Sequence, residues 1–439
     1  MSAAAPCSAA GTWTTAVWAW TVFACIAPSI SPDMSWDCAP ELSTSGPPGA
    51  QCQERRGPRH GESYTAWRTN YEEWREAGRA AFDFSAYDED KVAWTRTSYI
   101  QAQVMLHDRF LYDRANRRWT VSRYLDDLRS RYGGIDSVLL WPFYPNAGID
   151  ARNSYDFIDS LPGGMKQLKA MVAEFHAFGV KVLWPFFPWD TGTRQMGEPS
   201  YVSMVAKVLE IGADGINGDT MQGVNRSFWE AAMGRGRALA MEPEAMASTD
   251  DALRGLETDV MSWGYWRYEQ TPAIDGYKSL EMRHTTHICE RWATDRTDGL
   301  HHFFFSAAGY ESWENVWGAY NQLTPFHAAL LKRMAVILRG LGGFTSAPST
   351  QWSPHVPLAC AKTAEELNCV REPDVFVSHF ANSSEYSNGL PLSHHGHLLT
   401  QTVAANSSQP LPAGESRLRS GRCPDGDAAP AVRAGHALL

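Results

Sequence analysis

Acidic residues at the ends of two apolar segments in the middle of the chain could support chemistry. GADGINGDT (212–220) contains a short apolar segment around Ile216 that ends at Asp219, and the next segment, ALAMEPE (238–244), ends in Glu242 and Glu244. In a barrel of alternating strands and helices, the carboxyl ends of the strands build the active site. Two carboxylates on neighbouring strand ends suit glycoside hydrolysis. The alternative is that Asp219 only caps the following helix.

The segments around these acids alternate between strand-like and helix-like patterns. Amphipathic helices are predicted at 120–134, 162–180 and 200–213, with a long helix over 312–341. The predicted strands are 99–106, 135–145, 180–190, 212–220, 237–244, 259–266, 278–284 and 300–309. Eight such units predict an α/β fold of the (β/α)8 TIM-barrel type. An open doubly wound sheet is the alternative, but QAQVMLHDR lacks the glycine-rich phosphate turn that such a sheet has after its first strand.

Composition divides the chain into five parts. These are a possible signal peptide (1–28), a linker or leader (29–63), the barrel (64–343), a small β appendage (344–381) and a tail predicted to be disordered (382–439). The apolar run 12–28 is too short for a membrane span, which favours a secretory signal peptide. We therefore expect a secreted or lumenal protein. Cys38 with Cys52, and Cys360 with Cys369, are close enough in sequence to form disulfides.

The acids at the predicted strand ends have different expected roles. Asp219 is the expected nucleophile, and Glu244 or Glu242 is the expected general acid, with Glu281 as a third candidate. Aromatic faces stack well on sugar rings, and 12% of the residues are aromatic. The expected substrate-binding residues are His107, Asp108, Trp141, Tyr144, Trp189, Asp190, Glu281, His284 and Glu314.

Other chemistries have weaker support. His301 and His302 are adjacent, so on a strand they would face opposite ways and could not share a metal. We expect neither a metal nor a cofactor, although a metal-dependent barrel hydrolase remains an alternative. The chain has no GxSxG elbow and no P-loop. Its net charge of −10 argues against a nucleic-acid partner.

The acid-bearing segments also resemble a known group of enzymes. ADGINGD is similar to the nucleophile strand of retaining α-glycosidases of the α-amylase, α-galactosidase and dextranase groups, and its DG followed by GDT is most similar to the dextranase pattern. MEPE resembles the α-amylase strand whose Glu is the general acid. In ADGINGD, Asn217 stands where the α-amylase motif has an arginine, two residues before the nucleophile. The α-galactosidase arrangement would instead favour Glu281. The resemblance implies a glycoside hydrolase with a carbohydrate substrate. A catalytically silent carbohydrate-binding barrel is the remaining alternative.

Overall fold

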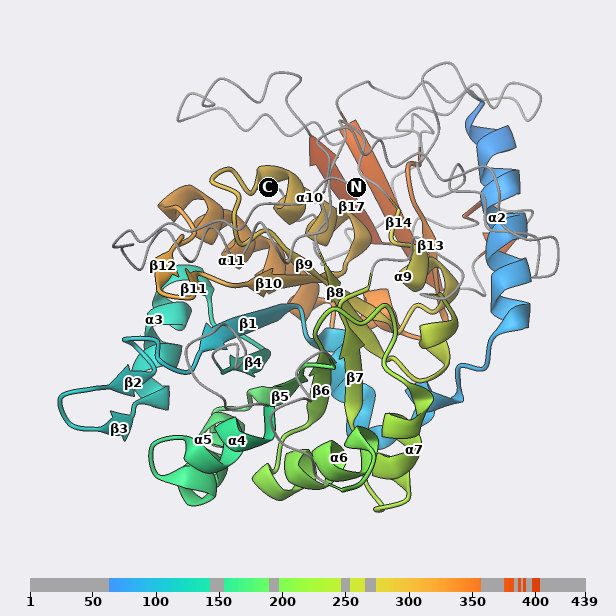
Figure 1. Ribbon diagram of the computed structural model, residues 1–439. Coiled ribbons are helices and arrows are strands. Elements are labelled where there is room, and N and C mark those ends of the chain that lie inside the picture. The colour runs from blue at the N-terminus through green and yellow to red at the C-terminus, as the bar shows by residue number, and fades with distance from the viewer. Residues whose placement is uncertain are drawn as a thin grey trace, which may run out of the picture.

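Eight parallel strands form the centre of the molecule (Figure 1). The computed structural model describes residues 63–142, 154–188, 197–245, 253–264, 274–356, 375–382, 386–387, 390–391 and 397–402. The strands are β1 (Ile100–Met105), β4 (Ser137–Trp141), β5 (Lys181–Phe186), β6 (Gly215–Gly218), β7 (Ala240–Pro243), β8 (Met261–Gly264), β9 (Thr285–Cys289) and β10 (Gly309–Ser312).

The order of the strands closes them into a barrel. The hydrogen-bonded order is β7-β6-β5-β4-β1-β10-β9-β8, so β1 lies between β4 and β10. A parallel bridge between Glu244 and Trp263, with the Ala245 N–H donating to the Trp263 carbonyl at 3.0 Å, joins β7 to β8. The predicted TIM-type barrel is therefore confirmed.

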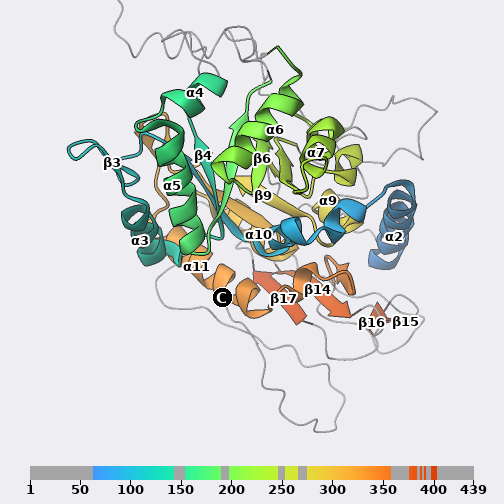
Figure 2. The same ribbon diagram turned by 90° about the horizontal axis from the view of Figure 1, so that it is seen from below.

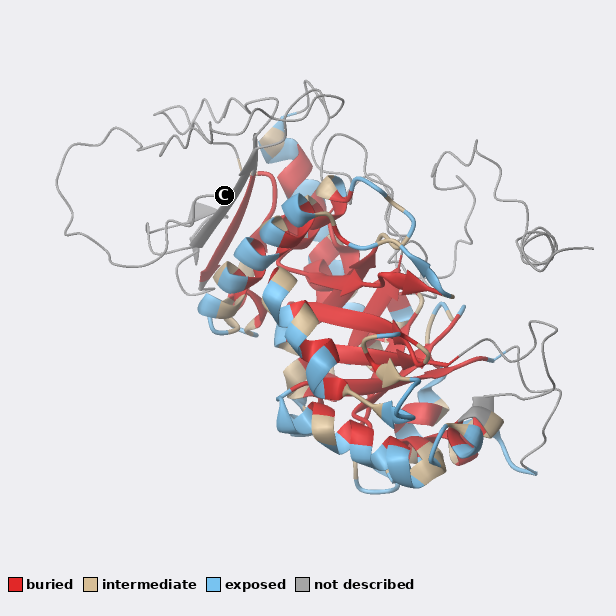
Figure 3. Cartoon of the chain, turned by 90° about the vertical axis from the view of Figure 1, so that its left-hand side faces the viewer, coloured by how far each residue is buried: buried red, intermediate tan, exposed pale blue. Residues whose placement is uncertain are grey.

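Helices cover the barrel because each has one apolar face. They are α3 (Val121–Tyr132), α4 (Ser154–Ser160), α5 (Gly164–Ala177), α6 (Ser200–Ile211), α7 (Arg226–Met233), α9 (Gly276–Leu280), α10 (Thr297–Ser306) and α11 (Pro325–Gly340). In α5, for example, Leu168, Met171, Val172 and Phe175 are buried at helical spacing. Figure 3 shows the same division, with buried strands and with helices exposed on their outer sides. An additional helix, α2 (Tyr64–Ala81), packs against α9.

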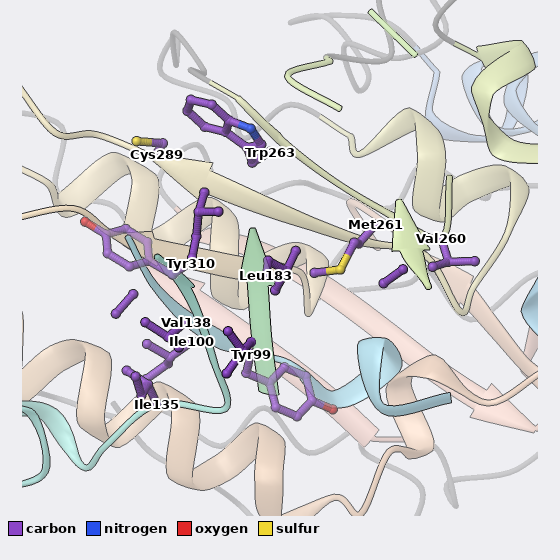
Figure 4. Close-up of a cluster of buried hydrophobic side chains, with 14 of the residues drawn as sticks. Tyr99, Ile100, Ile135, Val138, Leu183, Val260, Met261, Trp263, Cys289 and Tyr310 are labelled. Atoms are coloured by element: carbon purple, nitrogen blue, oxygen red, sulfur yellow. The ribbon is translucent and has the colours of Figure 1, made fainter. Parts of the chain in front are cut away.

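The strands are buried on both faces, because helices cover the outside of the barrel and side chains fill its interior. All six residues of β1 and all five residues of β4 are buried. Figure 4 shows part of the resulting core, with Ile100, Val138, Leu183, Met261 and Tyr310 contributed by five different strands. This packing fixes the positions of the strand ends, and therefore of the side chains at the barrel mouth.

The last two strands of the barrel differ from the prediction. Residues 278–284 lie in α9 and the turn that follows it, and the strand itself is β9. Residues 300–309 belong mostly to α10, and the strand is β10. α10 is apolar on nearly all sides because it is buried on nearly all sides, so its sequence resembles a core strand. The predicted long helix 312–341 is shorter, since the hairpin β11 (Asn315–Val316) and β12 (Ala319–Tyr320) precedes α11.

A small antiparallel sheet follows the barrel. It consists of β13 (Thr350–Ser353), β14 (Val375–Asn382) and β17 (His397–Thr402), and it lies against α10 (Figure 2). β17 falls within the part of the chain predicted to be disordered, so the β appendage extends beyond residue 381. The short hairpin of β15 (Tyr386–Ser387) and β16 (Leu390–Pro391) lies between β14 and β17 in sequence.

Several predictions concern other parts of the chain. The possible signal peptide 1–28 and the cysteine pairs Cys38–Cys52 and Cys360–Cys369 lie outside the described residues. Within the described ranges, no helix is both long and apolar enough to cross a membrane.

Candidate active site

Asp219 and Glu244 meet at the mouth of the barrel, by which we mean the end where the strands have their carboxyl termini. Asp219 directly follows β6, its N–H donates to the Phe186 carbonyl at 3.1 Å, and it is only 4% exposed. Glu244 follows β7, and its N–H donates to the Gly218 carbonyl at 3.1 Å. The Asp219 side chain lies close enough to the Glu244 carboxyl to lower its pKa. The mouth therefore holds two interacting carboxyl groups at the ends of neighbouring strands.

The surroundings of Glu244 favour its protonated form. Burial raises the pKa of the Glu244 carboxyl above its ordinary value. The Thr220 N–H, which donates to Glu244 Oε2 at 2.9 Å, lowers this pKa, as do the charge of Arg291 and the hydrogen bond with Asp219. Thr220 has a φ of 59°, a left-handed conformation that a β-branched residue rarely adopts. Such backbone strain clusters at functional sites, and here it aims an N–H at a carboxylate.

Aromatic side chains and one arginine lie at the same end of the barrel as the acid pair. Trp141, at the end of β4, contacts the Phe187 ring at a centroid distance of 5.2 Å and the Trp313 ring at 5.6 Å. Arg291, two residues after β9, stacks its guanidinium over the Trp313 ring at 4.3 Å, and its charge lowers the pKa of Glu244. The three rings are fully buried, so the mouth combines two carboxyl groups and a cation with closely packed aromatic rings.

A buried layer of polar side chains lies inside the barrel below the acid pair. Glu242 is fully buried and accepts hydrogen bonds from Gln101 Nε2 at 2.9 and 3.0 Å and from Asn217 Nδ2 at 2.9 Å. His287 Nδ1 lies 3.0 Å from its Oε1. Burial and the neighbouring Glu242 raise the pKa of the Glu311 carboxyl well above its ordinary value. Glu242, a sequence candidate for the acid, is therefore enclosed in the barrel interior, and Glu244 is the carboxyl beside Asp219.

Of the predicted binding residues, Trp141 lies in the mouth at the end of β4, and His107 and Asp108 follow the end of β1. Asp108 is 3% exposed, and its oxygens accept from the Phe110 N–H at 2.7 Å, Asn315 Nδ2 at 2.7 Å and the Tyr320 hydroxyl at 3.0 Å. Asp108 therefore fastens the β11–β12 hairpin to the end of β1. Burial lowers the pKa of the neighbouring His107, and the charge of Arg114 lowers it further.

Glu281 and His284 lie at the opposite end of the barrel from Asp219. They precede β9, because the strand begins at Thr285 and not at residue 278. Glu281 pairs with Arg283, at 2.8 and 3.0 Å. The His284 ring lies between the Tyr87 hydroxyl at 2.8 Å and the Ser262 hydroxyl at 2.9 Å. Tyr87 lies in the segment before β1, and Arg283 also pairs with Asp88 of that segment. These contacts join the amino-terminal ends of β8 and β9 to the segment before β1.

Glu314 points away from the barrel interior toward α3. Its carboxylate pairs with Arg131 at 2.6 and 2.7 Å and accepts from the Leu323 N–H at 2.7 Å. Glu311, on β10, accepts from Gln101 Nε2 at 3.4 Å and faces the interior, whereas Glu314 lies beyond the end of β10. Three further sequence candidates, Tyr144, Trp189 and Asp190, lie outside the described residues.

The structure adds residues to the mouth that sequence reasoning missed. They are Arg291, Trp313, Phe187 and, on β8 and β9, Trp263 and Cys289, which Figure 4 shows near each other. Burial raises the pKa of the Cys289 thiol well above its ordinary value, so the thiol is unreactive. A correct position for β9 would have placed Arg291 two residues beyond a strand end, where it could have been recognised.

Comparisons with known proteins agree with a barrel and go no further. No family model and no curated protein matches the sequence. The chain is similar in structure to TIM-barrel glycoside hydrolases at low identity. A noncanonic maltogenic α-amylase, AmyB from Thermotoga neapolitana, matches with a TM-score of 0.40 and 12% identity over 66% of this chain and 87% of that one. The α-N-acetylgalactosaminidase NagBb from Bifidobacterium bifidum, in its GalNAc complex, matches with a TM-score of 0.41 and 13% identity over 71% of this chain. This chain spans 60% of that structure, and similarity of this degree assigns no function.

Proposed function

We propose that the protein is a glycoside hydrolase whose catalytic carboxyl groups are Asp219 and Glu244. The observation that supports this most strongly is that the two side chains directly follow the neighbouring strands β6 and β7 and interact closely enough for Asp219 to lower the pKa of Glu244. Glycosidases of most families use a pair of carboxyl groups, one as nucleophile or base and one as acid.

The two acids take different roles because their surroundings differ. Burial raises the pKa of Glu244, so Glu244 keeps a proton to donate to the leaving glycosidic oxygen. Asp219 attacks the anomeric carbon as that bond breaks and forms a glycosyl ester. Glu244, now ionised, takes a proton from water, and the water oxygen displaces Asp219 from the sugar. This returns both groups to their starting states.

The distance between the two groups bears on this mechanism. The carboxyl groups of a retaining enzyme are about 5 to 5.5 Å apart, and those of an inverting enzyme about 6.5 to 9.5 Å. The proposed covalent step needs the shorter separation. The distance between the Asp219 and Glu244 carboxyl groups in a complex with a sugar therefore distinguishes the retaining from the inverting outcome.

The test is a screen of the purified protein against a panel of aryl α- and β-glycosides, together with Asp219→Asn and Asn225→Asp. Asn225 is an exposed helix cap at the start of α7, and aspartate caps a helix equally well, so this variant controls for a surface change. We expect the wild type and Asn225→Asp to cleave at least one glycoside. Asp219→Asn should lose at least about a thousandfold in kcat, because the nucleophile is gone.

Two other results would point to the alternatives. Binding of sugars with no cleavage by any variant would favour a catalytically silent carbohydrate-binding barrel. Hydrolysis that survives Asp219→Asn and is abolished by a chelator would favour a metal-dependent hydrolase. Either result would contradict the proposed roles of Asp219 and Glu244.

A further inference from the structure

A continuous row of tryptophan rings leads from the barrel mouth to the surface. Trp141 contacts Trp313, Trp313 contacts Trp317, and Trp317 contacts Trp292, with centroid distances of 5.6, 5.8 and 5.9 Å. Exposure rises along the row. Trp141 and Trp313 are fully buried, Trp317 is partly buried, and Trp292 is 55% exposed. Trp292 is therefore the member of the row that presents its ring to solvent.

The backbone at Trp317 is strained. Trp317 and Gly318 form the turn between β11 and β12, with φ of 51° and 94°. Two-residue hairpin turns with positive φ at both positions favour Asn-Gly or Gly-Gly. A tryptophan at the first position is costly, and strain of this kind points to a functional constraint. The constraint proposed here is the position of the indole ring next to Trp292.

The row is held in place by polar groups on both sides. Arg291 lies over three of the rings, at 4.3 Å from Trp313, 5.3 Å from Trp317 and 5.4 Å from Trp292. The hairpin that contains Trp317 is fastened by Asp108 through Asn315 and the Tyr320 hydroxyl. Arg291 also lowers the pKa of Glu244, so its charge links the row to the acid pair.

We propose that Trp292 and Trp317 form a binding subsite for an oligosaccharide chain that extends out of the mouth from the Asp219–Glu244 pair. This inference rests on the proposed function. The ring spacing is on the scale of one sugar unit, and indole rings pack against the C–H faces of sugars while their N–H groups stay available for hydrogen bonds. In this proposal the sugar stacked on Trp292 is a further unit of the chain, distinct from the one at the acid pair. The subsite therefore assigns the protein a substrate of several linked sugars.

The first experiment measures binding without catalysis. Asp219→Asn protein is titrated with maltoheptaose, isomaltoheptaose, cellohexaose and chitohexaose, and tryptophan fluorescence is recorded. We expect at least one chain to bind and the added change Trp292→Ala to weaken this binding about tenfold, or about 1.4 kcal/mol. Trp292→Phe should restore part of the affinity, because a smaller ring face remains. Phe178→Ala is the matched control, since Phe178 is an exposed ring (42%) that follows α5 at the opposite end of the barrel.

A second experiment compares long and short substrates in the otherwise wild-type protein. Trp292→Ala should lower the ratio of kcat/KM for the bound oligosaccharide to kcat/KM for its aryl glycoside, mainly through KM. The inference is overturned if no chain binds, or if Trp292→Ala binds it as tightly as the control. Cleavage of aryl glycosides with no effect of Trp292 would overturn the subsite and leave the proposed function standing. Binding that depends on Trp292, with no cleavage of any glycoside, would overturn the proposed function and leave the sugar-binding subsite standing.

Discussion

Asp219 lies close enough to Glu244 to lower its pKa, so the two carboxyl groups interact. Interacting carboxyl groups titrate as a pair, with apparent pKa values that belong to both groups. The acid role of Glu244 depends on burial outweighing three opposing influences, of which the Arg291 charge is one. Arg291 can be changed without touching either carboxyl group, so it provides a direct test of the electrostatics at the site.

Arg291→Met should move the alkaline limb of the pH–activity profile to higher pH. The Arg291 cation lowers the pKa of Glu244, so its removal raises that pKa, and the acid stays protonated to a higher pH. Methionine keeps an apolar chain against Trp313. The measurement is kcat/KM against pH for the aryl glycoside that is cleaved. A limb that moves to lower pH, or stays in place in a protein with unchanged melting temperature, would show that Glu244 is not the group titrating.

At the scale of elements, an ion-pair network outside the barrel connects a helix to the segment that follows a strand end. Arg131 on α3 pairs with Asp127 on the same helix and with Glu314 beyond β10. The Glu314 side chain is 10% exposed, so this pair lies between α3 and the segment that leads to the β11–β12 hairpin. The arrangement indicates a role in stability.

Glu314→Gln should lower the free energy of unfolding by about 2 kcal/mol, because hydrogen bonds to a charged partner are lost and Arg131 is left less well paired. Chemical denaturation of wild type and variant measures this difference. Arg129→Gln is the control, since Arg129 and its partner Asp126 are both more than half exposed and such pairs contribute little. If Glu314→Gln had an unchanged free energy of unfolding and a raised KM, Glu314 would be a substrate-binding residue and not a residue that stabilises the fold.

At the scale of the whole molecule, the sequence predicted the barrel because helical patterns alternate with short, largely apolar segments. It predicted Asp219 and Glu244 as site candidates because both directly follow such segments. Residues 300–309 were predicted as a strand because α10 is as apolar as a strand, and residues 278–284 lie in α9 and the turn before β9. That shift put Glu281 and His284 at a strand end and hid Arg291 beyond β9. The tryptophan row could not be predicted, because Trp292 and Trp317 lie in segments that only the closed barrel brings together.

In the proposed mechanism Asp219 forms the bond to the sugar and Glu244 supplies the proton, and covalent trapping separates these two roles. The protein is incubated with the 2-deoxy-2-fluoro glycosyl fluoride of the sugar whose aryl glycoside it cleaves, and the labelled peptide is identified by mass spectrometry. A fluorine at C2 slows both the formation and the hydrolysis of the glycosyl ester, and the fluoride leaving group speeds the formation, so the intermediate accumulates. We expect one adduct, on Asp219, and none in Asp219→Asn. An adduct on another carboxylate, or full turnover with no adduct, would show that Asp219 is not the nucleophile.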